Sequence, residues 1–476
     1  MTKNQATDPP LPGLPGRDSR RGQHTREREA LLSGDWHALL LRELSARLGA
    51  TRAAAVARPD MSSNVLRSVS TQLAVLYDRL PTLDGSEVVA AAMRSAGYWQ
   101  IMSGVQRMVI GLNQALVSIR PGVDGLPLYR YVSPGMVTGR ARPESPDIPE
   151  AIKELRLQRP PETDALEWVW ECWDSSPRSP SSHIEDTDGN DITARYARDL
   201  AGLPTGALVG DEYPYHKQDG TPVLPYVLYH AQRSTLLFDG FRNQELYEGS
   251  LAAAVGWTCY THCLQDASWP QRYTINCIPA GASAGVDSGA ATSRHSVVSD
   301  PSTILILEST DEGGAVATAG QWKAGSDPAM LADTLTKYEA RLAAGFGISP
   351  SDIQRMGGAA ARSGYAISIK QAAKRENQQK FIPHFARSDI SAAVKTAAIM
   401  NSANPKGARL PESGYRVTYR PVPMTAIERE AARRHVIEMM DRGLMSRVDA
   451  LIYLEPELTR ERAKRKLVDI GTQRLN

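Results

Sequence analysis

Residues 345–364 read GFGISPSDIQRMGGAAARSG, a run of small and cationic residues between two segments with helical apolar spacing. Asp327 and Pro328 are suited to cap and to start the preceding helix, and Pro350 prevents its continuation. That helix is predicted from apolar residues at intervals of three and four: Leu331, Leu335, Tyr338 and Leu342.

A longer helix is expected after this run, from Tyr365 to about Met400, with a kink at Pro383. Between Arg355 and Lys395 there are eight basic residues, which outnumber two acidic ones, Glu376 and Asp389. Eight minus two gives a local net charge of +6, whereas the whole chain has +2. A Gly-rich cationic loop leading into a basic helix is suited to touch a sliding polyanion. The alternative is an ordinary solvated loop and helix face.

The composition is that of a large globular chain. It has 476 residues, 42% of them hydrophobic, and 55 basic against 53 acidic side chains. Two to four domains are expected, and wholesale wrapping of nucleic acid is not. There is no apolar run for a membrane span and no apolar signal core at the N-terminus. Four cysteines are too few for a disulfide framework, which favours a reducing, intracellular setting.

The first half of the sequence predicts a mixed α+β region. Residues 1–25 are rich in Pro, Gly and Arg and are predicted to be a disordered basic tail. Helical spacing is expected over 26–83 and again from Ser86 to about Ile110. Short strands are then predicted around residues 117–119, 126–132 and 166–172, and turns at Asp188-Gly189 and Asp219-Gly220.

The second half predicts two long helices around a small β module. A helix is expected over 233–266, and two strand-like pieces, 273–278 and 303–307, lie between it and the helix that follows Asp327. This order implies an antiparallel helical pair that carries the module at its tip. Further on, residues 415–419 alternate as one strand, and three short helices close the chain. Their predicted caps are Thr425, Ser446 and Thr459.

Three short motifs suggest chemistry but have simpler explanations. Gly281–Gly285 matches the nucleophile elbow around Ser283, yet the following residues are a poor helix, so a flexible loop is favoured over a serine hydrolase. Cys259 and Cys263 would share one helix face, with His262 one residue round and Cys277 as the nearby further candidate, but buried cysteines are favoured over a metal site. Residues 186–197 fail the calcium-loop pattern. We therefore expect no enzyme activity, no cofactor and no metal.

The order of these parts resembles the portal proteins of tailed bacteriophages over roughly residues 60–470. Residues 64–81 are similar to the early helix of that family, and residues 304–308 and 327–350 resemble its strand and stem helix. Gly357–Ala366 is similar to the tunnel loop that leads into the tunnel helix. The motifs are loose, and their order carries the resemblance.

The resemblance implies an α+β wing over 26–235, rejoined at 403–423, and a stem of antiparallel helices at 236–268 and 326–347. It implies a small β clip at 269–325, a tunnel loop and long kinked tunnel helix over 348–402, and a helical crown over 424–476. The loop residues expected to face DNA are Arg355, Met356, Gly357, Gly358, Arg362 and Ser363, and the basic residues of the helix are Lys370 and Lys374.

The same resemblance implies a homo-oligomeric ring of twelve subunits at one capsid vertex, assembled in the host cytoplasm. Double-stranded DNA would pass through its axis without sequence recognition. The implied partners are the terminase large subunit, a head–tail adaptor, the major capsid protein and a scaffold, with no membrane. The alternatives are a serine hydrolase using Ser283 and another head–tail structural protein of a virion.

Overall fold

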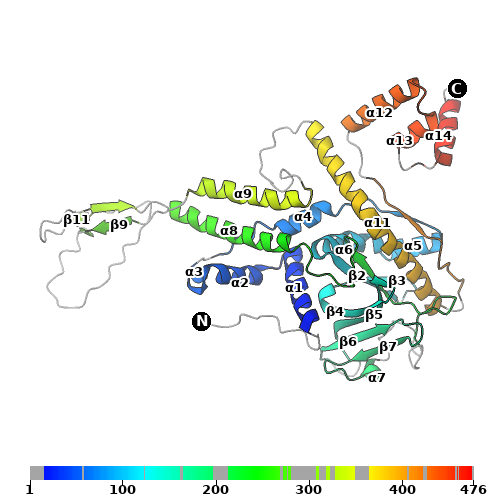
Figure 1. Ribbon diagram of the computed structural model, residues 1–476, viewed down its shortest axis with the longest axis horizontal. Helices are drawn as coiled ribbons and strands as arrows, with labels where there is room; N and C mark the ends of the chain where they lie inside the picture. Colours follow the sequence, from blue (N-terminus) through cyan, green and yellow to red (C-terminus); the bar gives the residue numbers. More distant parts are fainter. Residues whose placement is uncertain are drawn as a thin grey trace. The chain divides into compact units, whose positions relative to one another are not determined.

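The computed structural model confirms an α+β chain, mostly helical with small antiparallel sheets (Figure 1). It describes residues 16–55, 58–122, 124–160, 165–196, 213–268, 272–275, 277–279, 307–309, 318–321, 327–348, 364–404, 407–421, 426–455, 458 and 460–473. The chain divides into two compact units: Met1–Trp36, Leu66–Tyr247 and Phe346–Asn476 form the first, and His37–Val65 and Glu248–Gly345 form the second.

Two antiparallel sheets form the β part of the first unit. One has the order β3-β2-β8, with β2 at Gln114–Pro121, β3 at Pro127–Val132 and β8 at Tyr226–His230. The other has the order β4-β5-β6-β7, at Val137–Arg142, Ser145–Gln158, Glu167–Asp174 and Ser181–Glu185. Because β2 is the central strand and helices pack on its sheet, Leu116 and Ser118 are buried as well as Val117 and Ile119. The strand predicted around residues 117–119 is therefore found as β2, with both of its faces buried.

The helices of the first unit begin and end at local signals. The helix predicted from Ser86 to Ile110 is two helices, α5 (Glu87–Ser95) and α6 (Tyr98–Leu112). Gly97 between them takes φ 71°, a left-handed conformation that ends the first helix. The Ser86 side chain caps α5 by accepting from the Val89 N–H. Helix α4 spans Val65–Leu73, and the four-residue helix α7 spans Thr193–Tyr196.

The predicted disordered tail is wrong for its last ten residues. Helix α1 spans Gly16–Ser33, while residues 1–15 lie outside the described part of the chain. Arg21 is buried and donates hydrogen bonds to the carbonyl oxygens of Pro134, over 2.5 Å, and of Val137. Arg28 is also buried and donates to the carbonyl oxygen of Arg242 over 2.8 Å. The basic composition led to the wrong prediction of disorder, because these guanidinium groups are buried and donate to backbone oxygens. A pattern of charges along the sequence does not reveal such partners.

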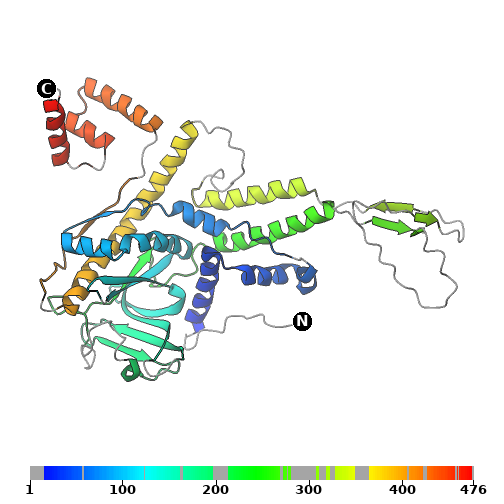
Figure 2. The same cartoon turned by 180° about the vertical axis from the view of Figure 1, so that it is seen from behind.

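The second unit contains the long helix pair. Helix α8 (Gln244–Ser268) and helix α9 (Pro328–Gly345) run side by side in both views (Figures 1 and 2). Asp327 caps α9 as predicted, accepting from the Ala329 N–H over 2.9 Å. Helix α8 starts eleven residues later than predicted, because Ser234 bonds to Leu236 in a turn and Asn243 takes φ 59°. The shorter helices are α2 (His37–Leu48) and α3 (Ala50–Ala55).

Two pairs of short strands separate α8 and α9 in the sequence. Strand β9 (Arg272–Ile275) pairs with β12 (Thr318–Gln321), and β10 (Cys277–Pro279) pairs with β11 (Leu307–Ser309), both antiparallel. The first predicted strand, 273–278, is thus found as β9 and β10. The second, 303–307, shares only Leu307 with β11, and the rest of it lies outside the described residues.

Leucine side chains of α9 pack over glycines of α8. A Cβ added to Gly249 would lie 2.7 Å from Leu342 Cδ1, and one added to Gly256 would lie 2.4 Å from Leu335 Cδ2. The glycines are seven residues apart, as are the leucines, and the pairs run in opposite order. The helices are therefore antiparallel, as predicted, and each leucine fills the space over a residue without a side chain.

The chain ends with a long helix, a strand and three helices. Helix α11 spans Gly364–Ala403 and continues through Pro383. Strand β13 (Arg416–Thr418) pairs with β1 (Thr82–Asp84) in antiparallel register, and Tyr415 and Tyr419 on either side of β13 are buried. The closing helices are α12 (Ala426–Asp441), α13 (Arg447–Leu454) and α14 (Arg460–Gln473). The predicted Ser446 cap is confirmed, whereas Thr425 and Thr459 lie outside the described residues.

Candidate functional site

The loop residues predicted to face DNA lie outside the described part of the chain: Arg355, Met356, Gly357, Gly358, Arg362 and Ser363. Lys370 and Lys374 belong to α11, but only the backbone of that part of the helix is described. Contact of all these residues with DNA stays a prediction. The side chains that can be placed at the candidate site are those of α11 from Arg375 onward.

Asp389 of α11 is completely buried and accepts hydrogen bonds from four tyrosines. Tyr98 and Tyr229 donate to Oδ1 over 2.7 and 2.9 Å. Tyr77 donates to Oδ2 over 2.8 Å, and Tyr419 donates to the same oxygen. These tyrosines come from α6, β8 and the segments that follow α4 and β13, so a single carboxyl group ties α11 to four parts of the first unit.

Burial dominates the electrostatics of this tyrosine–Asp389 cluster. It raises the pKa of Asp389, although the four hydroxyl donors oppose the shift. It also raises the pKa of Tyr77, Tyr98 and Tyr229 well above the usual tyrosine value, with the Asp389 charge as the next cause. The tyrosines therefore keep their protons and act as donors across the ordinary pH range.

Asp389, which the sequence analysis counted as one of two acidic residues in a basic stretch, is not on a solvated helix face. Asp389 lies one turn after Phe385 and one turn before Ala393, and both of these residues are fully buried. An acidic residue that lies between buried apolar residues at a spacing of four is the sequence pattern that could have predicted a buried polar cluster. The partners could not be found from the sequence, because they lie 30 to 312 residues away.

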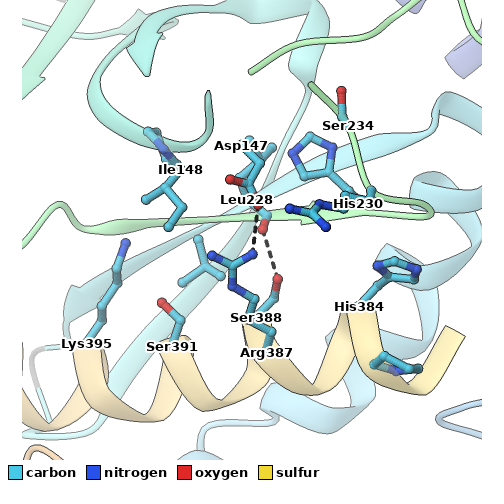
Figure 3. A pocket seen from close by; sticks show the side chains of 14 residues that line it. Asp147, Ile148, Leu228, His230, Ser234, His384, Arg387, Ser388, Ser391 and Lys395 are labelled. Atoms are coloured by element: carbon cyan, nitrogen blue, oxygen red, sulfur yellow. Dashed lines mark hydrogen bonds and ion pairs between the residues drawn. The ribbon is translucent and has the colours of Figure 1, made fainter. Parts of the chain in front are cut away.

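A second side of α11 lines a cavity of about 440 Å³ with the two sheets (Figure 3). Strand β5 contributes Asp147 and its neighbours, and β8 contributes Leu228 and His230. The residues of α11 recur at intervals of three and four on one side of the helix: His384, Arg387, Ser388, Ser391 and Lys395. Arg387 Nη1 donates to Asp147 Oδ2 over 2.8 Å, and the Ser388 hydroxyl donates to the Leu228 carbonyl oxygen over 3.0 Å.

Lys395, one of the eight counted basic residues, does not lie on a solvated helix face. Its side chain is half-buried at the cavity wall, and its ammonium donates to the Tyr226 carbonyl oxygen. Desolvation, followed by the nearby charges of Arg142 and Lys217, lowers the pKa of Lys395 to about 7. Two of the eight counted basic residues therefore need revision: Lys395 loses its charge near neutral pH, and Arg387 is neutralised by Asp147.

Both histidines at the cavity are held neutral. Burial lowers the pKa of His230 to about 4, although the carboxylates of Asp147 and Asp239 oppose the shift. A hydrogen bond between the His230 ring and the backbone of Asp147 also opposes the shift. Burial also lowers the pKa of His384. The cavity thus gathers basic groups, of which Arg387 is paired with Asp147 and the two histidines are neutral.

A separate ion cluster joins the two sheets of the first unit. Glu171 is buried and pairs with Arg120 and with Arg156 Nη1, the latter over 2.5 Å. Burial disfavours its charge, but the two guanidinium groups outweigh burial and lower the pKa of Glu171. Trp173 Nε1 donates to the same carboxylate over 2.7 Å. These groups satisfy one another, so we regard the cluster as structural.

The described residues include one group with metal-ligating side chains, Cys172, His183 and Glu185 on β6 and β7. Lys153 Nζ donates to both oxygens of Glu185 over 2.9 Å, and His183 Nε2 lies 2.8 Å from Oε1. Burial raises the pKa of the Cys172 thiol to about 12. An ammonium thus occupies the carboxylate that a cation would need, and the thiol stays protonated.

The structure assigns no chemical role to the other motifs singled out in the sequence. Cys259 and Cys263 on α8 are only half-buried and His262 is exposed, so the expected full burial of these cysteines is wrong. Ser283 lies outside the described residues. Among the described helices, none combines the length and the apolar character that a membrane span requires.

Comparisons with known proteins gave matches among solved structures alone. No protein-family profile and no curated protein matches the chain. A chain from the "Virion of native gene transfer agent (GTA) particle" is similar at 12% identity and a TM-score of 0.45, covering 84% of this chain and 92% of that one.

Two further chains have similar values. One is from the "Neck of native GTA particle computed with C12 symmetry", at 12% identity and a TM-score of 0.44, covering 82% of this chain and 90% of that one. The other is from the "Neck of empty GTA particle computed with C6 symmetry", at 14% identity and a TM-score of 0.42, covering 82% and 89%. All three are structural similarities at low sequence identity.

Proposed function

We propose that the chain is a portal subunit: a structural protein of the head–tail junction that forms a ring-shaped channel for double-stranded DNA at one capsid vertex. One observation carries the proposal. An antiparallel helix pair, α8 and α9, brackets two short strand pairs and precedes the 40-residue α11 and a three-helix end. This is the order of stem, clip, tunnel helix and crown that the sequence resemblance implies.

The proposed role is mechanical and not enzymatic. A head-to-tail ring needs two different complementary faces on each subunit, which a long helix pair can offer. Twelve copies, the terminase large subunit, a head–tail adaptor, the capsid protein and a scaffold complete the proposed assembly in the virion. Nonspecific DNA contact needs cations and small residues, which residues 355–364 supply.

Particle size tests the assembly. The purified full chain should sediment as a particle of about twelve copies, with a central channel in negative-stain images. A chain truncated after Pro423 should still form the ring if α12–α14 are a separable crown. A monodisperse monomer of the full chain at micromolar concentration would contradict the proposal.

DNA retention tests the loop. Arg355→Ala with Arg362→Ala should leave ring formation unchanged and weaken DNA retention at low salt, and the deficit should shrink as salt rises. Lys337→Ala with Arg442→Ala is the matched control, because both are exposed cations, each paired with an acid four residues earlier in the chain. Equal retention by the loop variant and the parent would contradict DNA contact by these arginines.

A further inference from the structure

The three C-terminal helices bury few of their apolar side chains. Among the described residues of α12–α14, the buried apolar side chains are Val436, Ala450 and Ala463, one from each helix. In contrast, four large apolar side chains are 45% to 67% exposed: Ile437, Leu444, Tyr453 and Val468. Exposed apolar surface bordered by polar side chains is typical of a protein-binding surface.

An open groove of about 300 Å³ gathers apolar side chains of all three helices. Its apolar lining is Val436, Ile437 and Met440 of α12, Ala450, Leu451 and Leu454 of α13, and Leu467 of α14. Together with Arg447, the lining residues of α13 recur at i, i+3, i+4 and i+7, so one side of two successive turns faces the groove. Ile437 in its wall is 54% exposed, so a partner can reach these side chains.

Arg433 and Arg447 lie at opposite ends of this α12–α14 groove. The ring centroids of His435 on α12 and Tyr453 on α13 are 6.0 Å apart, so the end of α13 lies beside the middle of α12. A short turn joins the two helices, which therefore run antiparallel. Arg433 is at the end of the groove where α13 ends, and Arg447 is at the end where α13 begins.

The groove is cationic at both ends. Arg433 and Arg447 are exposed, and no acid is among the described residues that line the groove. The acids close to them in the sequence are engaged by other cations: Glu430 by Arg434, Glu438 by Arg442 and Asp449 by Arg460. A partner with an acidic residue at each end of the contact would therefore complement the charge of the groove.

We propose that the α12–α14 groove binds an amphipathic helix of a partner protein, with an apolar stripe that packs on the groove and an acidic residue at each end of the stripe. A helix with apolar residues at i, i+3, i+4 and i+7 fits an apolar groove between two helices. Duplex DNA fits less well, because its phosphates would pair with the arginines but leave Ile437, Leu451 and Leu454 uncovered. The site is built from α12–α14 alone and does not depend on ring formation.

Peptide binding to the full-length protein tests the groove. The probe is a fluorescent, helix-stabilised peptide of about four turns, with leucines at i, i+3, i+4 and i+7 and a glutamate one turn before and one turn after them. The control peptide has lysines in place of the glutamates. Fluorescence anisotropy should show saturable binding of the glutamate peptide and about tenfold weaker binding of the lysine peptide. Added salt should reduce this difference.

Charge reversal of the groove sharpens the test. Arg433→Glu with Arg447→Glu should exchange the preference, so that the lysine peptide binds more tightly than the glutamate peptide. A loss of structure in α12–α14 would weaken both peptides and would not produce this exchange. Arg429→Glu with Arg465→Glu is the matched control, because both arginines are exposed and lie outside the groove lining.

A further variant tests the apolar contact. Ile437→Ser should weaken both peptides about fivefold, and it should leave the fold intact because this side chain is already half exposed. No saturable binding of the glutamate peptide, or equal binding of the two peptides by the parent, would overturn the proposal. Displacement of the peptide by a short DNA duplex, or self-association that Ile437→Ser abolishes, would overturn it in favour of DNA or of a second copy. Sedimentation of the same samples reports ring formation separately.

Discussion

Helix α11 and the α8–α9 pair are both long helical elements, but different interactions fix them. The position of α11 is set by a buried carboxyl group, Asp389, on which four tyrosine hydroxyls converge. The α8–α9 pair is set by shape, with Leu335 and Leu342 filling the space over Gly256 and Gly249. Hydrogen bonds depend on direction, so the Asp389 cluster fixes one position of α11 along and around its axis. A leucine packed over a glycine requires only that the two helix backbones lie close together.

A polar contact is also present in the helix pair, but it is peripheral. Glu339 of α9 accepts from Trp257 Nε1 over 2.6 Å and from the Ser63 hydroxyl, and none of these side chains is fully buried. Exposure lowers the value of such bonds, because water can replace either partner. The comparison therefore predicts that the packing of α11 is most sensitive to the loss of a buried polar group. The packing of the α8–α9 pair should be most sensitive to added side-chain volume.

The largest effect is expected from Asp389→Ala. It leaves four buried hydroxyl groups without their acceptor, and we expect unfolding free energy to fall by about 4 kcal/mol. Denaturant unfolding followed by tyrosine and tryptophan fluorescence measures this. Glu376→Ala, an exposed acid on the same helix, is the control and should change stability by less than about 0.5 kcal/mol. Similar losses in both variants would contradict the role of the tyrosine–Asp389 cluster.

A smaller loss is expected from Gly256→Ala. Alanine normally stabilises a helix relative to glycine by about 1 kcal/mol. Here the new Cβ would lie 2.4 Å from Leu335 Cδ2, so we expect a net loss of about 1–2 kcal/mol in thermal or denaturant unfolding. Gly345→Ala is the matched control, since its Cβ would meet nothing within 4 Å, and it should stabilise. A stabilising Gly256→Ala would show that the two helices are not in close contact there.

Per pH unit, the smallest effect is the pH dependence of stability that Lys395 causes. Lys395 has its pKa lowered to about 7 in the fold, so between about pH 7 and 10.5 the unfolded chain binds a proton that the folded chain does not. The contribution of Lys395 to stability therefore rises with pH in this window, by at most about 1.4 kcal/mol per pH unit, and is lost as pH falls towards 7. The stability difference between the parent and Lys395→Met, measured at several pH values, isolates it from tyrosine titration. A difference that is flat with pH would mean that Lys395 is solvated.

The sequence predicted most elements of the helical second half, because apolar spacing and local caps each leave their own pattern. Apolar spacing located α8, α9 and α11, because a helix that packs on one side repeats every three to four residues. Local caps fixed the starts of α9 and α13 at Asp327 and Ser446. Errors arose where a side chain bonds far along the chain, as with Arg21 in the supposed tail and Asp389 in the supposed basic face.

By itself, the sequence determined the α+β class, the two long helices around short strands and the cationic Gly-rich run at 345–364, because periodicity, capping and composition are local properties. Only the tertiary structure decided which charges are exposed. Lys395 and Asp389 lie six residues apart on one basic helix, yet one lines a cavity and the other meets four tyrosines. Burial and long-range partners set the charge state of a side chain, and a linear pattern contains neither.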